Sequence, residues 1–127
     1  MLKHTILVVD DSDICLELAR DALMEAGFKV ITTQTPLGAS RLLRRSEARC
    51  VVLDVSMPAL SGDKLVQILK KATDDDLAVI LHSDRPMKDL VALGERCGAT
   101  AVAKKEPDCV PLVAAVRRVF ARRSNPG

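Results

Sequence analysis

Aromatic side chains are scarce in this sequence of 127 residues, which has two Phe and neither Tyr nor Trp. Proteins that bind single-stranded nucleic acid stack bases on aromatic side chains, so the composition argues against that kind of binding. The net charge of +2 is also too small to indicate a nucleic-acid or membrane partner by itself. The core must therefore be packed from aliphatic residues, and any argument from charge must be local.

Metal-binding cysteine pairs and long apolar segments are missing as well. The four cysteines are widely spaced without a C-x-x-C motif, and the chain has only two histidines, which argues against a zinc site. No stretch approaches the ~18 apolar residues of a membrane span, and the N-terminal segment lacks the pattern of a signal peptide. We therefore expect a cytoplasmic protein with reduced thiols.

The length suits one domain with its own core, which we expect at residues 1–123, followed by a short tail at 124–127. Five apolar runs alternate with segments of helical periodicity. The runs lie at residues 6–9, 28–33, 50–55, 77–83 and 99–105, and the helical segments at 12–27, 36–48, 63–72, 87–98 and 107–123. Ser12 or Asp13 is the expected cap of the first helix, and Gly27 and Gly98 are expected helix ends.

The apolar runs are apolar throughout and do not alternate with polar residues. Such runs are typical of strands that are covered on both faces. Together with the helical segments between them, they predict an α/β fold with a parallel five-stranded sheet and helices on each side. The flavodoxin-like order 2-1-3-4-5 is the arrangement that we consider for this sheet.

Charged and hydroxyl side chains stand where the predicted strands end. In chain order they are Asp10, Asp11, Asp54, Ser83 and Lys105. Parallel α/β sheets bind ligands at the carboxyl ends of their strands, at the point where the strand order reverses. If the first and third strands are neighbours, the three carboxylates meet in one crevice.

Three carboxylates that lie this close repel one another unless a cation holds them. Hard oxygen ligands beside open coordination positions suit Mg²⁺, which keeps several waters and pairs with phosphate. A lysine and a hydroxyl facing the same place add donors for phosphate oxygens. The set predicts phosphoryl chemistry, in which Asp54 forms an aspartyl phosphate and Asp10 and Asp11 hold the metal.

Three segments carry a resemblance to a known family. VVDDSD (residues 8–13), VVLDVSMPALSG (51–62) and AVAKKE (101–106) resemble the receiver domain of two-component response regulators. Asp54 lies 43 residues after Asp11, Ser83 lies 29 after Asp54, and Lys105 lies 22 after Ser83, spacings similar to those of the family. The resemblance extends from Ile6 to Phe120.

The resemblance implies a signalling switch that accepts phosphate on Asp54 in a Mg²⁺-dependent step. The implied metal ligands are Asp10, Asp11, Asp54 and the backbone carbonyl of Ser56. Such a domain catalyses only its own phosphorylation and dephosphorylation, so we do not expect an enzyme that acts on a metabolite. A hydrolase of the haloacid dehalogenase kind is disfavoured, because that family has a second Asp where this chain has Ser56.

The resemblance also assigns Ser83 as the hydroxyl that moves onto the phosphate and Lys105 as the lysine that pairs with it. Lys104 competes with Lys105, because successive strand residues face opposite ways and only one can enter the crevice. The spacing favours Lys105. Ser83 has a plainer alternative as a cap for the following helix.

The partners implied are a histidine kinase or phosphotransfer protein upstream and a protein target or fused output domain downstream. We expect no nucleic-acid or membrane contact by this domain, and a homodimer stays open. The sequence does not distinguish a single-domain regulator from a piece of a longer chain. Arginines near the helix ends are expected to complement helix dipoles, with a basic docking patch as the alternative.

Several positions depart from the family pattern. Asp84 replaces the usual small residue after the hydroxyl of Ser83, and Val102 stands where an aromatic switch residue is common. These two departures motivate an alternative function, a receiver-fold module that binds protein independently of phosphorylation. Glu106 stands where a cis proline is usual, and we expect a trans bond there because a cis bond would cost ~2.5–4 kcal/mol. For His82, a polar residue in an apolar strand, we favour a hydrogen-bonded structural role over a proton shuttle.

Overall fold

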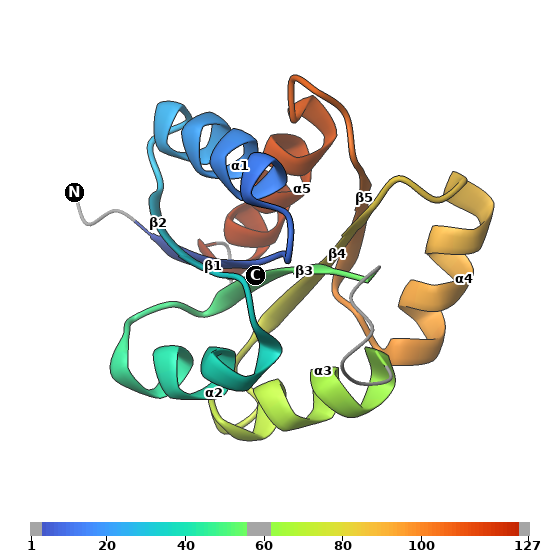
Figure 1. Ribbon diagram of the computed structural model, residues 1–127. Coiled ribbons are helices and arrows are strands. Elements are labelled where there is room, and N and C mark those ends of the chain that lie inside the picture. Colours follow the sequence, from blue (N-terminus) through green and yellow to red (C-terminus); the bar gives the residue numbers. More distant parts are fainter. Residues whose placement is uncertain (1–3, 56–61, 125–127) are drawn as a thin grey trace.

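The computed structural model describes residues 4–55 and 62–124, and its centre is a five-stranded sheet (Figure 1). The strands are β1 (Thr5–Val9), β2 (Lys29–Thr33), β3 (Cys50–Asp54), β4 (Ala78–Ser83) and β5 (Ala101–Lys104). Their order is β2-β1-β3-β4-β5, and each neighbouring pair is parallel. The predicted flavodoxin-like fold and strand order are confirmed.

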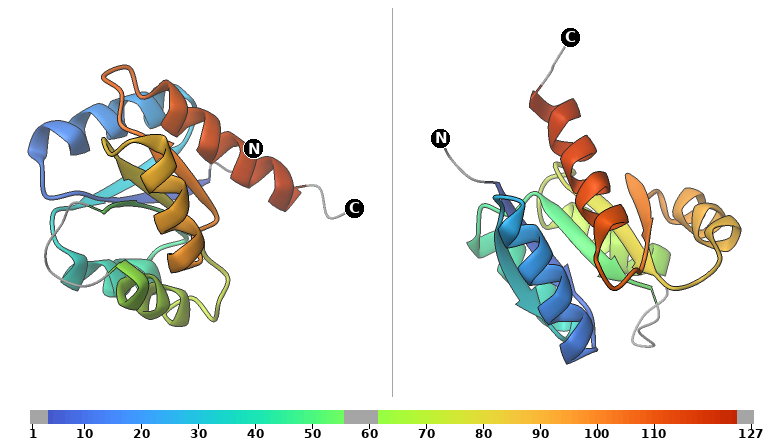
Figure 2. Two further views of the ribbon diagram at one scale, coloured as in Figure 1. Left: turned by 90° about the vertical axis from the view of Figure 1, so that its right-hand side faces the viewer. Right: turned by 90° about the horizontal axis from the view of Figure 1, so that it is seen from above.

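Helices cover both faces of this sheet. They are α1 (Asp13–Glu25), α2 (Pro36–Arg45), α3 (Gly62–Lys71), α4 (Met87–Cys97) and α5 (Val110–Ser124). Figures 1 and 2 show α1 and α5 on one face, and α2 and α3 on the other with α4 beside β5. None of the helices in the described ranges is long and apolar enough to cross a membrane. The predicted tail begins at the last residue of α5, and residues 125–127 lie outside the described residues.

Alternation along the strands divides the core in two. In β1, Ile6 and Val8 face the helices α1 and α5, whereas Leu7 and Val9 face the layer of α2, α3 and α4. All four side chains are at most 1% exposed, and burial of each such side chain contributes about 1.5–3 kcal/mol. The central strands are therefore apolar on both sides. The outer strands β2 and β5 are only partly buried, because each has one neighbour, and there the expectation of full cover was wrong.

The boundaries of α1 follow from residues that the sequence made recognisable. Ser12 is the N-cap, and its Oγ accepts a hydrogen bond of 3.3 Å from the backbone N–H of Cys15. Gly27, just after the C-cap Ala26, has a φ of +100°, which a residue with a side chain rarely adopts. Because α1 begins three residues after Asp10, its first turn lies directly beside the end of β1.

Candidate functional site

The carboxyl ends of four strands bring the predicted site residues to one edge of the sheet. Asp10 and Asp11 follow β1, Asp54 ends β3, Ser83 ends β4, and Lys105 follows β5. Ser56, whose carbonyl was predicted as a metal ligand, lies outside the described residues. The edge thus gathers residues that are far apart in the sequence.

Lys105 joins two of the acids directly. Its Nζ lies 3.0 Å from Oδ2 of Asp10 and 3.5 Å from Oδ1 of Asp54. Strand alternation explains why Lys105, and not Lys104, reaches them: Ala103, two residues earlier, packs in the core beneath α1 and α5, and Lys105 shares its side of the sheet. The choice of Lys105 over Lys104 agrees with this geometry.

The three acids form a compact group. One carboxylate oxygen from each of Asp10, Asp11 and Asp54 lies within 4.8 Å of the others. Asp10 and Asp54 are 2% and 3% exposed, whereas Asp11 is exposed. Three carboxylates and the one ammonium of Lys105 leave two negative charges, and hard oxygen ligands with that charge fit a divalent cation such as Mg²⁺.

Burial and pairing act in opposite directions on the charges of this group. Burial raises the pKa of Asp10, and the hydrogen bonds from the Ser12 backbone N–H (3.0 Å) and from Lys105 only partly offset it. Burial would lower the pKa of Lys105, but the hydrogen bond to Asp10 and the charges of Asp54 and Asp10 outweigh it and raise that pKa. Lys105 therefore stays an ammonium, whereas burial destabilises the anionic form of Asp10 when no further cation is bound beside it.

Ser83 lies next to Lys105 through the backbone, because the Lys105 N–H donates a 2.7 Å hydrogen bond to the Ser83 carbonyl. The Ser83 side chain is fully buried, and its Oγ accepts a hydrogen bond of 3.1 Å from the backbone N–H of Arg85. The N-cap of α4 is Pro86, so Ser83 shapes the turn before α4 and is not its cap. Asp84 is exposed beside this turn.

His82 is the residue whose surroundings differ most from expectation. Its register partner on β3 is Asp54, and alternation places both on the α1 and α5 side of the sheet. The imidazole is 4% exposed, and its Nε2 has no hydrogen-bond partner among the described residues. Burial, with the nearby charge of Lys105, lowers the pKa of His82 to about 4. The predicted hydrogen-bonded role therefore does not hold at Nε2. That His82 lies on the same face of the sheet as Asp54 could be predicted from the alternation of side chains along β4.

Cys15 is a neighbour of the site that its spacing in the sequence did not reveal. Its Sγ accepts a hydrogen bond from Lys105 Nζ at 3.7 Å. The usable signal is local: Cys15 follows the N-cap Ser12 by three residues and so lies in the first turn of α1. The loop after Lys105 also matches expectation, since every peptide bond in the described ranges is trans.

A family model described as the response regulator receiver domain matches residues 6–117 of this chain. The chain belongs to the response regulator receiver domain family. The transcriptional regulatory protein PrrA of Mycobacterium tuberculosis is 33% identical over 122 residues, which cover 96% of this chain and 52% of that protein. A stress response regulator protein of Lodderomyces elongisporus is 30% identical over 99 residues, which cover 76% of this chain and 27% of that protein. This receiver domain thus spans about half the length, or less, of these curated relatives.

Solved structures agree with the family. A response regulator from Thermotoga maritima has a TM-score of 0.79 and 28% identity, with 94% of this chain and 99% of that chain covered. The chemotaxis protein CheY4 of Vibrio cholerae has a TM-score of 0.80, with 93% of this chain and 99% of that chain covered, but its 21% identity shows likeness of fold alone. The chain is thus a receiver domain of two-component signalling by sequence and by fold.

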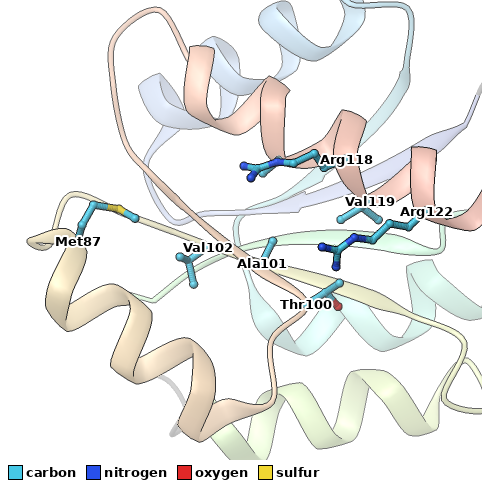
Figure 3. Close-up of a pocket in the computed structure, with 8 residues that line it drawn as sticks. Met87, Thr100, Ala101, Val102, Arg118, Val119 and Arg122 are labelled. Atoms are coloured by element: carbon cyan, nitrogen blue, oxygen red, sulfur yellow. The ribbon is translucent and has the colours of Figure 1, made fainter.

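The receiver domain also has a concave surface away from Asp10, Asp11 and Asp54, which we call the α4–β5–α5 surface. A cavity of about 330 Å³ lies there, and Figure 3 shows Met87 of α4, Thr100, Ala101 and Val102 at β5, and Arg118, Val119 and Arg122 of α5 around it. Val102 also packs closely on α4, since a Cβ added to Gly94 would lie 2.6 Å from its Cγ1. Aliphatic and cationic groups therefore line this surface.

Proposed function

We propose that this receiver domain accepts a phosphoryl group on Asp54 in a Mg²⁺-dependent step and that the modification alters a docking surface. The observation that carries the proposal is the group of three carboxylates within 4.8 Å, two of them bridged by Lys105. An Asp carboxylate is a competent nucleophile toward phosphorus. The donor would be a phosphohistidine of a histidine kinase or phosphotransfer protein.

Each residue would have a separate role in this step. Asp54 Oδ attacks phosphorus as the bond to the donor nitrogen breaks, and Asp10, Asp11 and the Ser56 carbonyl would complete the metal ligands. Bound Mg²⁺ would neutralise charge on the phosphoryl oxygens. Lys105 already contacts Asp54 and would donate to a phosphoryl oxygen. The roles of Asp10, Asp11, Asp54 and Lys105 are supported by the charge and the positions of these groups.

Ser83 would complete the binding of the phosphoryl group. Its Oγ accepts from Arg85 N–H and keeps its own proton, which it can donate to a phosphoryl oxygen. A change at Ser83 would be transmitted to the turn before α4, because the same hydroxyl shapes that turn. The proposed output is therefore a movement of the α4–β5–α5 surface, read by a downstream protein target or a fused output domain.

The proposal also covers the binding partner of the α4–β5–α5 surface and the cellular location of the protein. Arg118 and Arg122 beside apolar groups suit a protein segment with acidic and apolar side chains, and we assign no nucleic-acid or membrane contact to this domain. A second copy of the chain is the alternative occupant of the surface. We place the protein in the cytoplasm, where its four cysteines would stay thiols, and no disulfide joins them in the structure.

One observation favours the alternative of a module that binds protein independently of phosphorylation. Val102 is held against Gly94 on α4, and β5 has no aromatic side chain that could change its position with the state of Asp54. A surface of fixed shape could be recognised without a switch. The two functions differ in whether Asp54 takes up phosphate at all.

The deciding experiment is the intact mass of the protein after incubation with acetyl phosphate and Mg²⁺. One added phosphate is expected on the native chain and on the control Asp89→Asn, which removes an acid in the first turn of α4. Asp54→Asn and a chelated sample should gain none. A native protein that gains no phosphate and also binds no Mg²⁺ by calorimetric titration would contradict the proposal and support the alternative.

A further inference from the structure

A second cavity lies beside the acidic site, on the side of the sheet covered by α1 and α5. Its volume is about 270 Å³, and its walls include Cys15 and Leu18 of α1, His82 of β4, and Lys105, Pro107 and Cys109. The cavity thus brings two thiols together with the lysine that bridges Asp10 and Asp54. The phosphorylation chemistry proposed above uses neither thiol.

Cys15 has the surroundings of a reactive thiol. It is partly exposed, whereas Cys50, Cys97 and Cys109 are buried. Its Sγ accepts a hydrogen bond from the Lys105 ammonium at 3.7 Å, and it lies in the first turn of α1. A partly exposed sulfur beside an ammonium lies where an oxidant can reach it and where a polar donor contacts it.

Cys109 has the surroundings of a second, protected thiol. It is 3% exposed but lines the same cavity, immediately before α5. Burial raises the pKa of Cys109, and the nearby groups Asp108 and Cys15 raise it further, so the two sulfurs are electrostatic neighbours. Its φ of +56° is unusual for a residue with a side chain, and a shift of this turn would relieve that conformation.

We propose that Cys15 and Cys109 form a peroxide-sensitive thiol pair, in which Cys15 is oxidised first and Cys109 then closes a disulfide. The Cys15 thiolate attacks one oxygen of hydrogen peroxide, the O–O bond breaks, and the leaving hydroxide takes a proton to become water. The Cys109 sulfur then attacks the resulting sulfenic sulfur, the S–S bond forms, and the leaving hydroxide takes the Cys109 thiol proton to become a second water. Two thiols lose two electrons and two protons, and the peroxide is reduced to two waters.

The disulfide would act on the acidic site through Lys105. The S–S bond would hold the two Cα atoms within roughly 7 Å of each other and so tie the segment from Lys105 to Cys109 to α1. That segment carries the ammonium that contacts Asp10 and Asp54. Oxidation therefore slows phosphate uptake, a consequence that rests on the proposed function, whereas formation of the disulfide does not.

The first test treats the reduced, folded protein with hydrogen peroxide, blocks remaining thiols and maps the peptides by mass spectrometry. We expect a peptide pair joined through Cys15 and Cys109, with Cys50 and Cys97 still reduced as internal controls. In Cys109→Ser, Cys15 should be trapped by dimedone as a sulfenic acid. Oxidation of Cys15 no faster than that of buried Cys50, or a sulfinic acid at Cys15 without a disulfide, would overturn the pairing.

The second test compares phosphate uptake from acetyl phosphate by reduced and oxidised protein. In the native protein we expect oxidation to lower the initial rate several-fold and dithiothreitol to restore it. In Cys15→Ser we expect treatment with peroxide to leave the rate of that variant unchanged. If the disulfide forms but the rate is unchanged, the regulatory consequence is wrong. If the reduced protein takes up no phosphate and binds no Mg²⁺, the proposed function fails, while the peptide map still decides the thiol pair.

Discussion

The acidic edge and the α4–β5–α5 surface belong to one domain but relate differently to the family pattern. At the edge, the acids and the lysine that the family pattern calls for are present, and Lys105 bridges Asp10 and Asp54. On the surface, Val102 replaces the common aromatic residue and packs against Gly94. Phosphoryl chemistry needs particular charges at fixed positions, whereas a docking surface can be built from many side chains. The two regions should therefore respond differently to substitution.

The largest effect on stability is expected at the acidic edge, from Lys105→Met. Without metal, this change removes the ammonium that contacts the buried carboxylates of Asp10 and Asp54, which should lower the free energy of unfolding by about 3 kcal/mol. The matched control is Lys104→Met, on the other side of the strand, with an expected change below about 0.5 kcal/mol. Urea unfolding in chelator measures both, and equal effects would show that the bridge does not stabilise the protein.

A smaller effect is expected from pH at His82. In the unfolded chain this imidazole has its ordinary pKa of 6.5, and in the folded protein its pKa is about 4. Its contribution to stability is therefore complete above the unfolded pKa and is lost as the pH falls toward the folded one. Between about pH 7 and about pH 5 the native protein should lose about 2 kcal/mol through this group.

His82→Leu should remove that part of the acid sensitivity. Urea unfolding at both pH values measures it, with His4→Gln as the control, because His4 stacks on Phe120 at a distance from the site. An unchanged pH dependence in His82→Leu would mean that the buried imidazole titrates as it does in the unfolded chain.

The smallest effect is expected at the docking surface, from Gly94→Ala. The added methyl group would meet Val102 Cγ1 at 2.6 Å and push α4 away from β5, at a cost of about 1–2 kcal/mol. Val102→Ala in the same chain should recover much of that cost, so the double variant is more stable than the sum of the single changes predicts. Phosphate uptake should be kept in Gly94→Ala, and its loss would show that the two regions are not separable.

Much of the fold could be predicted because its signals are local. The apolar runs, the caps at Ser12 and Gly98 and the polar residues at strand ends all lie within a few residues of the elements they define. The half-exposed edge strand β2 was not foreseen, because its short apolar run does not show how many neighbours it has. The missing partner of His82 Nε2 was not foreseen either, since hydrogen bonding depends on every group around the ring.

The sequence by itself determined which side chains stand at the carboxyl ends of the strands and, through alternation, which face each one shares. Only the tertiary structure decided that Lys105 contacts both Asp10 and Asp54, and that the thiol of Cys15, far away in the chain, lies against the same ammonium. The physical reason is that alternation is a property of neighbouring residues, whereas these contacts require the packing of α1 and α5 over a sheet whose strands are not in chain order.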